Sequence, residues 1–565
     1  MSDLPSAISL LWPAGTAARN IKPWFDSTPA DVGLGDLVRG LCLELRYFDR
    51  VQGILLNLCD DPNVIQYRQE IFDDLLADEV LVGSLESALP ILTQLGYYGA
   101  TSRPGDTLLQ QTVFRLGELH LHVDGVTRLQ GIFANITPQS RGLLALRNML
   151  VQLAAEPSFV NLQKELPALS VRIENIGSIT LGINLDSRLR PVATTLLAVN
   201  PFKFKGDSLL ARLFGKRTNT SSSDPDEQQN GLAELHETPP DGPGHDNPLL
   251  VPLFRDLNEI LQTAAGPVAT ALRQYTRLNG SLLIALEGEI AFYLGAVRLI
   301  RKLHASGLAT CRPTILPKDV REMEISGAYN LNLALRLLGR ETPSSKSTIA
   351  ERIIANDVRF DDSGRIFILT GPNQGGKTTY IQMVALLHVL AQAGVHVPAQ
   401  SARLSPIDSL YTHFQRDEKP ELEAGRLGEE ARRLSDIFDR ATRHSLVLLN
   451  ESLASTSPTE SLYLAQDVVR ALRLLGARAI FATHLHALAE AADAINAELA
   501  GESAVASLVS QVVPTSNAAT PTSNRTFKII RAAPMGMSHA KDIAERYGIS
   551  FEQLQAKLGR RAQAS

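Results

Sequence analysis

Apolar residues recur at intervals of three and four along residues 31–165, the spacing that one face of an amphipathic helix requires. The pattern is clearest in the segments LGDLVRGLCLELRYFDRVQGILLNL, VIQYRQEIFDDLLADEVLVGSLESAL and SRGLLALRNMLVQLAA. The same period returns over residues 248–310. Both stretches predict a helical bundle or scaffold, and nothing in residues 31–165 is typical of a catalytic site.

The segment between these helical stretches has a different pattern. Residues 170–200 are rich in β-branched side chains, alternate in part and are interrupted by glycine and by Asp-Ser, which predicts a short β-hairpin or small sheet. Residues 216–247 are polar and rich in proline, glycine and serine, as expected of a disordered linker or loop. We therefore expect a helical arm that leaves the body of the protein, carries a β insert and returns.

From about residue 316 the pattern becomes that of an α/β domain. The short apolar strands RIFILT, SLVLLNE and RAIFATH alternate with helical segments. A flexible insert at 514–524 separates two apolar flanks that could pair as hairpin strands at a sheet edge. The predicted organisation is an N-terminal extension (1–30), a mostly helical region (31–315) and an α/β domain (316–565).

Composition narrows the class of protein. The chain has 565 residues, enough for several domains, and a net charge of −5, so any contact with nucleic acid must come from a local basic patch. The three cysteines show no metal-ligand spacing and are expected to be reduced. The first residues lack the basic and apolar regions of a signal peptide, and no apolar run is long enough to span a bilayer. We expect a soluble, cytoplasmic protein that does not associate with membranes.

The sharpest motif is GPNQGGKT at residues 371–378, which fits the phosphate-binding P-loop (Walker A) pattern between an apolar strand and a helix. Glycines let backbone N–H groups surround phosphate oxygens, and the helix N-terminus adds partial positive charge. Lys377 is expected to contact the β- and γ-phosphates, and the Thr378 hydroxyl to coordinate Mg²⁺. A glycine turn with an incidental lysine is the weaker alternative. The predicted ligand is ATP with Mg²⁺, and the expected nucleotide-binding residues are Gly371, Pro372, Asn373, Gln374, Gly375, Gly376, Lys377, Thr378 and Thr379.

Two further apolar strands end in polar residues. The strand at 445–451 ends in Asn450 and Glu451, where P-loop ATPases place an acidic pair for Mg²⁺ and for the attacking water. Asn450 can accept a hydrogen bond from a Mg²⁺-bound water but brings no negative charge, whereas Glu451 is a candidate general base. The strand at 479–484 ends in His484, which can sense a γ-phosphate by hydrogen bonding. The alternatives are an exposed strand-end acid and a structural histidine.

The order of these motifs resembles the MutS family of DNA mismatch repair ATPases, which are of the ATP-binding-cassette (ABC) type. The segments that carry the resemblance are GPNQGGKTTY, VHVPAQSARLSPIDSLYTHF, LVLLNESLASTSPTES and FATHLHAL, over about 355–490. The resemblance is weaker over about 526–550, and looser still for the helical arm, which is similar to the family's lever and clamp region. It implies an α/β P-loop ABC-type ATPase domain preceded by a mostly α-helical lever domain with a small β insert.

The resemblance also implies roles for particular residues. Lys377, Glu451 and His484 become the catalytic set, with His484 as the switch histidine, and Thr378 and Asn450 hold Mg²⁺, partly through water. Residues 455–457 lie in a loop that crosses a dimer interface, and residues 397–399 link the ATP site to the rest of the domain. Families of this type are dimers that bind each ATP between two subunits, so the resemblance implies a homodimer that binds DNA, mainly through phosphates.

Four departures from the family pattern are visible. Asn450 replaces the usual aspartate, and the signature segment at 425–430 (GRLGEE) lacks the Ser-Thr pair. We also expect neither the mismatch-reading domain with its Phe-x-Glu wedge at the N-terminus nor a nuclease-like domain after the ATPase domain. The sequence therefore indicates a divergent member with slow ATP turnover.

Three hypotheses follow. The first is an ATP-dependent DNA-binding protein of mismatch repair, in which ATP binding and hydrolysis at a dimer interface drive movement of the lever and clamp on DNA. The second is an ATP-operated switch whose partner is a protein, which the acidic net charge favours. The third is a small-molecule P-loop kinase, against which the long helical arm and the Thr-His strand end argue.

Overall fold

The computed structural model describes most of the chain outside its polar inserts. The described residues are 8–16, 24, 27–100, 108–134, 136–174, 178–200, 266–275, 280–340, 348–415, 425–514, 523–534 and 548–563. They form two compact units, of which unit 1 comprises 1–86, 138–145 and 288–565, and unit 2 comprises 87–137 and 146–287. The predicted loop at 216–247 lies outside the described residues.

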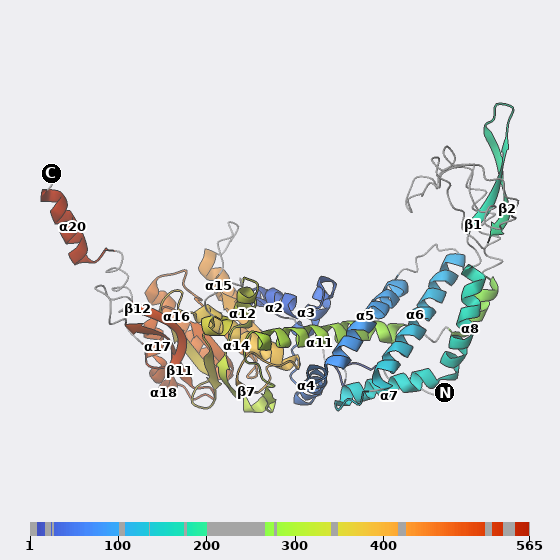
Figure 1. Cartoon of the computed structure of the whole chain (residues 1–565). Helices are drawn as coiled ribbons and strands as arrows, with labels where there is room; N and C mark the ends of the chain where they lie inside the picture. Colours follow the sequence, from blue (N-terminus) through green and yellow to red (C-terminus); the bar gives the residue numbers. More distant parts are fainter. Residues whose placement is uncertain are drawn as a thin grey trace. The chain divides into compact units, whose positions relative to one another are not determined.

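The main sheet of unit 1 is a six-stranded mixed sheet in the order β12-β11-β6-β10-β9-β8 (Figure 1). Its strands are β6 (Ile366–Thr370), β8 (Leu410–Phe414), β9 (Leu446–Asn450), β10 (Arg478–Ala482), β11 (Val505–Pro514) and β12 (Ser523–Arg531). All neighbours are parallel except β11 and β12, which form an antiparallel hairpin. Strands β6, β8 and β10 are buried along their whole length, as expected when both faces of a parallel sheet are covered.

Helices cover this sheet and complete its core. They are α14 (Lys377–Gln392), α15 (Gly425–Arg440), α16 (Pro458–Leu475), α17 (His486–Glu490) and α18 (Ala492–Glu498). Helix α16 begins where Ser457 accepts a hydrogen bond from the Glu460 N–H and Pro458 occupies the first turn, and it ends at Gly476 in the left-handed conformation. One apolar cluster joins β6, β9 and β10 to α15–α18. The mixed helical and α/β character predicted from the sequence is thus observed.

A second, four-stranded sheet lies in unit 1, in the order β3-β7-β4-β5. Its strands are β3 (Thr314–Ile315), β4 (Met323–Ala328), β5 (Asn356–Phe360) and β7 (Ser401–Leu404). The short helices η5 (Lys318–Val320), α12 (Leu331–Leu338) and α13 (Ile349–Arg352) belong to the same region. Helix α13 starts with a reciprocal capping box between Thr348 and Glu351, which fixes its N-terminus beside β5.

The N-terminal part of unit 1 packs against the part that carries the six-stranded sheet. It contains α1 (Thr28–Asp31), α2 (Leu34–Leu41), η1 (Leu45–Tyr47), α3 (Phe48–Leu56) and α4 (Pro62–Ala77). Buried side chains hold the extended segment 8–16: the Tyr67 hydroxyl donates to Ser9 O at 2.8 Å, and Arg68 Nε to Leu11 O at 2.9 Å. Arg68 also donates to Gln392 O at 2.9 Å, at the end of α14. Helix α20 (Phe551–Gln563) follows near the C-terminus.

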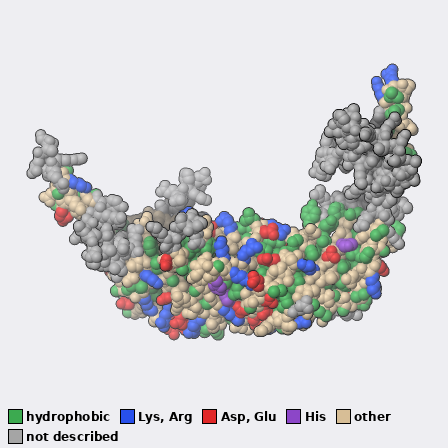
Figure 2. All heavy atoms as spheres, viewed as in Figure 1, with side chains coloured by type: hydrophobic (Ala, Val, Ile, Leu, Met, Phe, Trp, Pro, Cys, Tyr) green, Lys and Arg blue, Asp and Glu red, His purple; other side chains and the backbone are tan. Residues whose placement is uncertain are grey.

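Unit 2 is helical and carries a β-hairpin. Its elements are α6 (Leu108–Ala134), α8 (Pro157–Glu174), η4 (Arg273–Tyr275), β1 (Ser178–Leu185) and β2 (Pro191–Asn200). Three helices are shared by the two units, because the division falls within α5 (Glu79–Ala100), α7 (Arg141–Ala155) and α11 (Ser281–Ala305). The hairpin predicted at 170–200 is present but starts later, because residues 170–174 continue α8. Its far end is basic (Figure 2). Among the described residues no helix is both long and apolar enough to cross a membrane.

Candidate functional site

The P-loop connects the buried strand β6 to the start of α14, as its sequence motif requires. Gly371 has φ 142° and Gly376 has φ 91°, which are backbone conformations that residues other than glycine rarely adopt. A Cβ on Gly371 would lie 2.6 Å from the Ser510 Cβ of strand β11, so the close approach of the loop to the sheet also needs glycine. Ser510 Oγ donates to Gly375 O at 2.7 Å and fixes the loop from the same side.

Lys377 is the first residue of α14 and is folded back over the loop. Its Nζ donates to Gly371 O at 2.9 Å and to Pro372 O at 3.3 Å, and lies 3.5 Å from Glu451 Oε1. The side chain is 6% exposed. Burial lowers the pKa of Lys377, and the neighbouring Glu451 carboxylate acts in the opposite direction. The ammonium group is therefore held at the mouth of the loop by groups that phosphate oxygens can replace.

Glu451 and His484 meet because β9 and β10 are neighbouring parallel strands whose carboxyl ends lie at the same sheet edge. His484 Nε2 lies 3.0 Å from Glu451 Oε1. Glu451 has φ 53°, an uncommon conformation for a glutamate, and its N–H donates to Ala482 O at 2.9 Å. The carboxylate thus stands between the Lys377 ammonium and the His484 imidazole, so the three proposed catalytic side chains form one cluster.

Asn450 and Thr378 also come together. Asn450 Nδ2 donates to Thr378 Oγ1 at 3.3 Å. Asn450 Oδ1 is shielded from solvent and has no hydrogen-bond partner among the described residues. An unsatisfied buried acceptor beside a hydroxyl suits a hydrated cation, so these two residues fit a Mg²⁺ ion bound partly through water, although neither carries negative charge.

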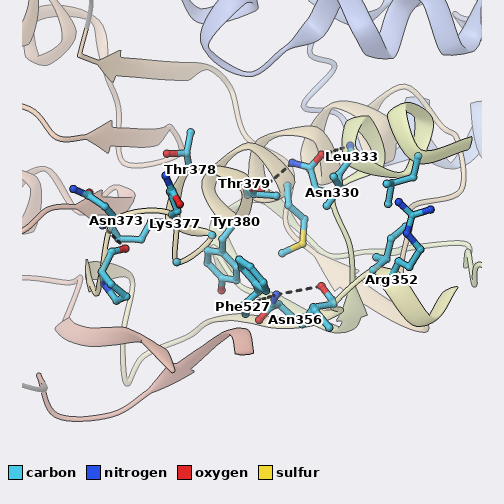
Figure 3. Close-up of a pocket in the computed structure, with 18 of the residues that line it drawn as sticks. Asn330, Leu333, Arg352, Asn356, Asn373, Lys377, Thr378, Thr379, Tyr380 and Phe527 are labelled. Atoms are coloured by element: carbon cyan, nitrogen blue, oxygen red, sulfur yellow. Dashed lines mark hydrogen bonds between the residues drawn. The ribbon is translucent and has the colours of Figure 1, made fainter. Parts of the chain in front are cut away.

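An elongated pocket of about 580 Å³ extends from the P-loop (Figure 3). The P-loop residues 372–378, Thr379 and Glu451 line one end, and Arg352 and Leu333 lie at the other. The part beyond the loop is largely apolar and is lined by Leu333, Leu337, Ile353, Ile354, Met383 and Phe527. A polar end followed by an apolar slot of this size fits a nucleoside triphosphate.

Phe527 is a pocket residue that the sequence did not predict. It lies in an irregularity of the β11–β12 hairpin, has φ 57°, and its ring lies near Gly376. The Asn356 side chain holds this backbone from both sides: Nδ2 donates to Phe527 O at 3.2 Å, and Oδ1 accepts from Ile529 N at 2.7 Å. An aromatic residue held in a strained conformation over a pocket is typical of a ligand contact.

Other predicted residues lie outside this cluster. Ser457 caps α16, and its hydroxyl also donates to Glu460 Oε2 at 2.9 Å. Residues 425–430 form the start of α15, and Val397 pairs with Cys311 in an isolated bridge of backbone hydrogen bonds. None of these residues lines the pocket.

Models of two domains of one protein family match this chain. A model of MutS domain V matches residues 367–541, which contain the P-loop, Glu451, His484 and Phe527. A model of the MutS2 N-terminal domain matches residues 60–306. The chain belongs to the MutS family. The two matches cover the region that carries the P-loop motif and much of the helical region before it.

Individual relatives match over shorter lengths. The chain is 31% identical over 219 residues to DNA mismatch repair protein MutS of Lactobacillus johnsonii (38% of this chain, 25% of the relative). It is 33% identical over 240 residues to MutS of Sorangium cellulosum (42% and 25%). It is 36% identical over 156 residues to MutS of Chlorobium chlorochromatii (27% and 17%). The chain therefore spans at most about a quarter of the length of these relatives.

Proposed function

We propose that this protein binds ATP with Mg²⁺ and hydrolyses it at the P-loop site. The observation that carries the proposal is the position of Glu451, whose carboxylate lies 3.5 Å from Lys377 Nζ and 3.0 Å from His484 Nε2 at the end of a nucleotide-sized pocket. A cation and a carboxylate at the phosphate end of one pocket, with an imidazole against the carboxylate, are groups that can carry out phosphoryl transfer to water.

Each residue has a defined task in this proposal. Lys377 turns from the Gly371 and Pro372 carbonyl oxygens to the β- and γ-phosphates. Glu451, released from Lys377, accepts a proton from the attacking water, and His484 orients the carboxylate. Bound Mg²⁺ supplies charge neutralisation on the phosphate oxygens, with Thr378 and Asn450 as the residues that hold it. In the apolar part of the pocket, Phe527 and Ile353 contact the nucleobase.

We further propose that the protein acts on DNA as a homodimer, with the nucleotide sites at the dimer interface and the helical unit as the lever. The support is the family membership and the basic end of the β1–β2 hairpin, where Arg188 and Arg190 flank the exposed Leu189. Both arginines are exposed, and the Asp186 carboxylate in the same turn accepts hydrogen bonds from their backbone N–H groups. Contacts of this kind to phosphates weaken steeply as salt increases.

The test is steady-state ATP hydrolysis by the full chain with and without DNA, beside Lys377→Ala and Glu451→Ala. We expect slow turnover by the wild type, loss of nucleotide binding in Lys377→Ala, and retained binding with at least about a hundredfold lower turnover in Glu451→Ala. DNA binding is measured separately with plain, mispaired and branched duplexes at several salt concentrations. No affinity for any of them at low salt would overturn the DNA part of the proposal.

Asn450 favours one alternative function, an ATP-binding switch with a protein partner. Its neutral amide at the Mg²⁺ position weakens the electrostatic stabilisation of the reacting phosphates relative to an aspartate. Wild-type protein that binds ATP tightly, never hydrolyses it and has no affinity for DNA would identify this alternative.

A further inference from the structure

Glu451 stands in a loop whose backbone is strained. Both Glu451 (φ 53°) and Leu453 (φ 63°) adopt the left-handed conformation without being glycine. Such a conformation persists only when surrounding contacts hold it, and here it decides where the Glu451 carboxylate points. The contacts that hold this loop are therefore part of the proposed hydrolytic site.

One neighbouring strand holds the loop through the backbone. The Glu451 N–H donates to Ala482 O of β10 at 2.9 Å, on one side of β9. On the other side of β9 lies β8, whose His413 is paired in register with Leu449. The side of the loop that faces β8 is held by side chains.

Ser452, the residue after Glu451, makes this second attachment. Its hydroxyl donates to His413 O at 2.9 Å, and its Oγ lies 2.7 Å from His413 Nδ1. A serine hydroxyl has one hydrogen to donate, so the short contact to Nδ1 requires that His413 carries its proton on that nitrogen. Both side chains are buried, Ser452 at 2% and His413 at 0% exposure, so water cannot replace either partner.

We propose that His413 and Ser452 are positioning residues that set the orientation of Glu451 for ATP hydrolysis. The proposal rests on the proposed ATPase function and adds two residues that do not line the nucleotide pocket. Hydrogen bonds to His413 hold Ser452, and Ser452 fixes the backbone that follows Glu451. The Glu451 carboxylate is thereby held between Lys377 and His484. Nucleotide binding needs the P-loop and the apolar pocket, and neither His413 nor Ser452 is among the residues that line them.

The test compares Ser452→Ala and His413→Leu with the wild type in full-length protein. Loss of the anchor should lower kcat by about tenfold or more, because small misplacements of a catalytic group have effects of this size. The Kd for a fluorescent ATP analogue should stay within about twofold, because the phosphate and base contacts remain. His413→Asn should retain most of the turnover, since its amide can donate to Ser452 in place of Nδ1.

Two controls separate positioning from a general loss of packing. Ser503→Ala removes another buried serine hydroxyl that donates to a carbonyl, Ala477 O at 3.1 Å, and should leave kcat unchanged. The second control is made in a Glu451→Gln background, whose residual turnover is followed over hours. There Ser452→Ala should cause no further loss of kcat, because Ser452 contributes to kcat only by orienting the carboxylate that Glu451→Gln has already removed.

The outcomes are distinct. Ser452→Ala with wild-type kcat, or with a further tenfold loss in the Glu451→Gln background, would overturn the positioning role while leaving the ATPase proposal intact. Wild-type protein without any turnover would overturn the ATPase proposal and the positioning role together.

Discussion

Asn450 Nδ2 lies 3.3 Å from Thr378 Oγ1, and the Oδ1 atom of the same amide has no hydrogen-bond partner among the described residues. The amide therefore donates toward the hydroxyl expected to coordinate Mg²⁺, and its oxygen is left available to a metal-bound water. A carboxylate at this position would instead accept a hydrogen bond from the Thr378 hydroxyl, and it would add a negative charge. The difference between the two side chains can be measured directly.

Asn450→Asp should increase the affinity for Mg²⁺. Even through an intervening water and at high effective dielectric, the added charge is worth about 1 kcal/mol or more, which is about fivefold or more in affinity. The measurement is a Mg²⁺ titration of nucleotide binding at fixed ATP, with Asn450→Ala as the variant that removes the oxygen. Equal Mg²⁺ midpoints for wild type and Asn450→Asp would show that residue 450 does not face the cation.

Phe527→Ala should weaken ATP binding through the base end of the pocket. Stacking of a base on an aromatic ring contributes about 1–3 kcal/mol, so the Kd for ATP should increase by roughly 5- to 150-fold. Inorganic tripolyphosphate, which has no base, should bind wild type and variant equally. Phe527→Tyr keeps the ring and is expected to bind ATP as the wild type does. A parallel loss of tripolyphosphate binding would instead indicate collapse of the P-loop beneath the ring.

His122 makes unit 2 sensitive to acid. It lies on α6, is 3% exposed, packs edge-on against Phe159, and burial lowers its pKa from 6.5 to about 4. Below pH 6.5 the unfolded chain binds a proton that the folded chain does not, so stability decreases as pH falls from 6.5 to about 4. The contribution from this one group is roughly 3 kcal/mol over that interval.

The measurement is the free energy of unfolding by urea between pH 7 and pH 4, for the wild type and His122→Leu. The variant should lose less stability over this range, because its unfolding is no longer accompanied by the binding of a proton at residue 122. His304, which is exposed and hydrogen-bonded to Thr310, offers a matched control when replaced by glutamine. Parallel stability curves for wild type and His122→Leu would show that His122 does not titrate as described.

The sequence predicted the phosphate end of the site better than the base end. Residues 371–378, Asn450, Glu451 and His484 follow short apolar strands, and parallel strands necessarily bring their carboxyl ends to one sheet edge. Phe527 and Asn356 come together only through an irregular β-hairpin and a side-chain contact between separate sheets. His413 and Ser452 lie 39 positions apart and are joined by strand register, which hydrophobic pattern alone does not specify.

Gly371→Ala should disable nucleotide binding while the protein stays folded. The substitution places a Cβ 2.6 Å from the Ser510 Cβ and forces alanine to adopt φ 142°, so the loop must shift away from β11. The Kd for ATP should increase by at least about tenfold, because the backbone N–H groups of the loop no longer converge on the phosphates. Adding Ser510→Gly removes the Cβ–Cβ clash but also the hydrogen bond from Ser510 Oγ to Gly375 O, so it should restore only a small part of the affinity, and the backbone strain stays uncorrected. The measurement is ATP binding by titration calorimetry for the single and double variants. Wild-type affinity in Gly371→Ala would mean that the loop does not need its close approach to β11 in order to hold the phosphates.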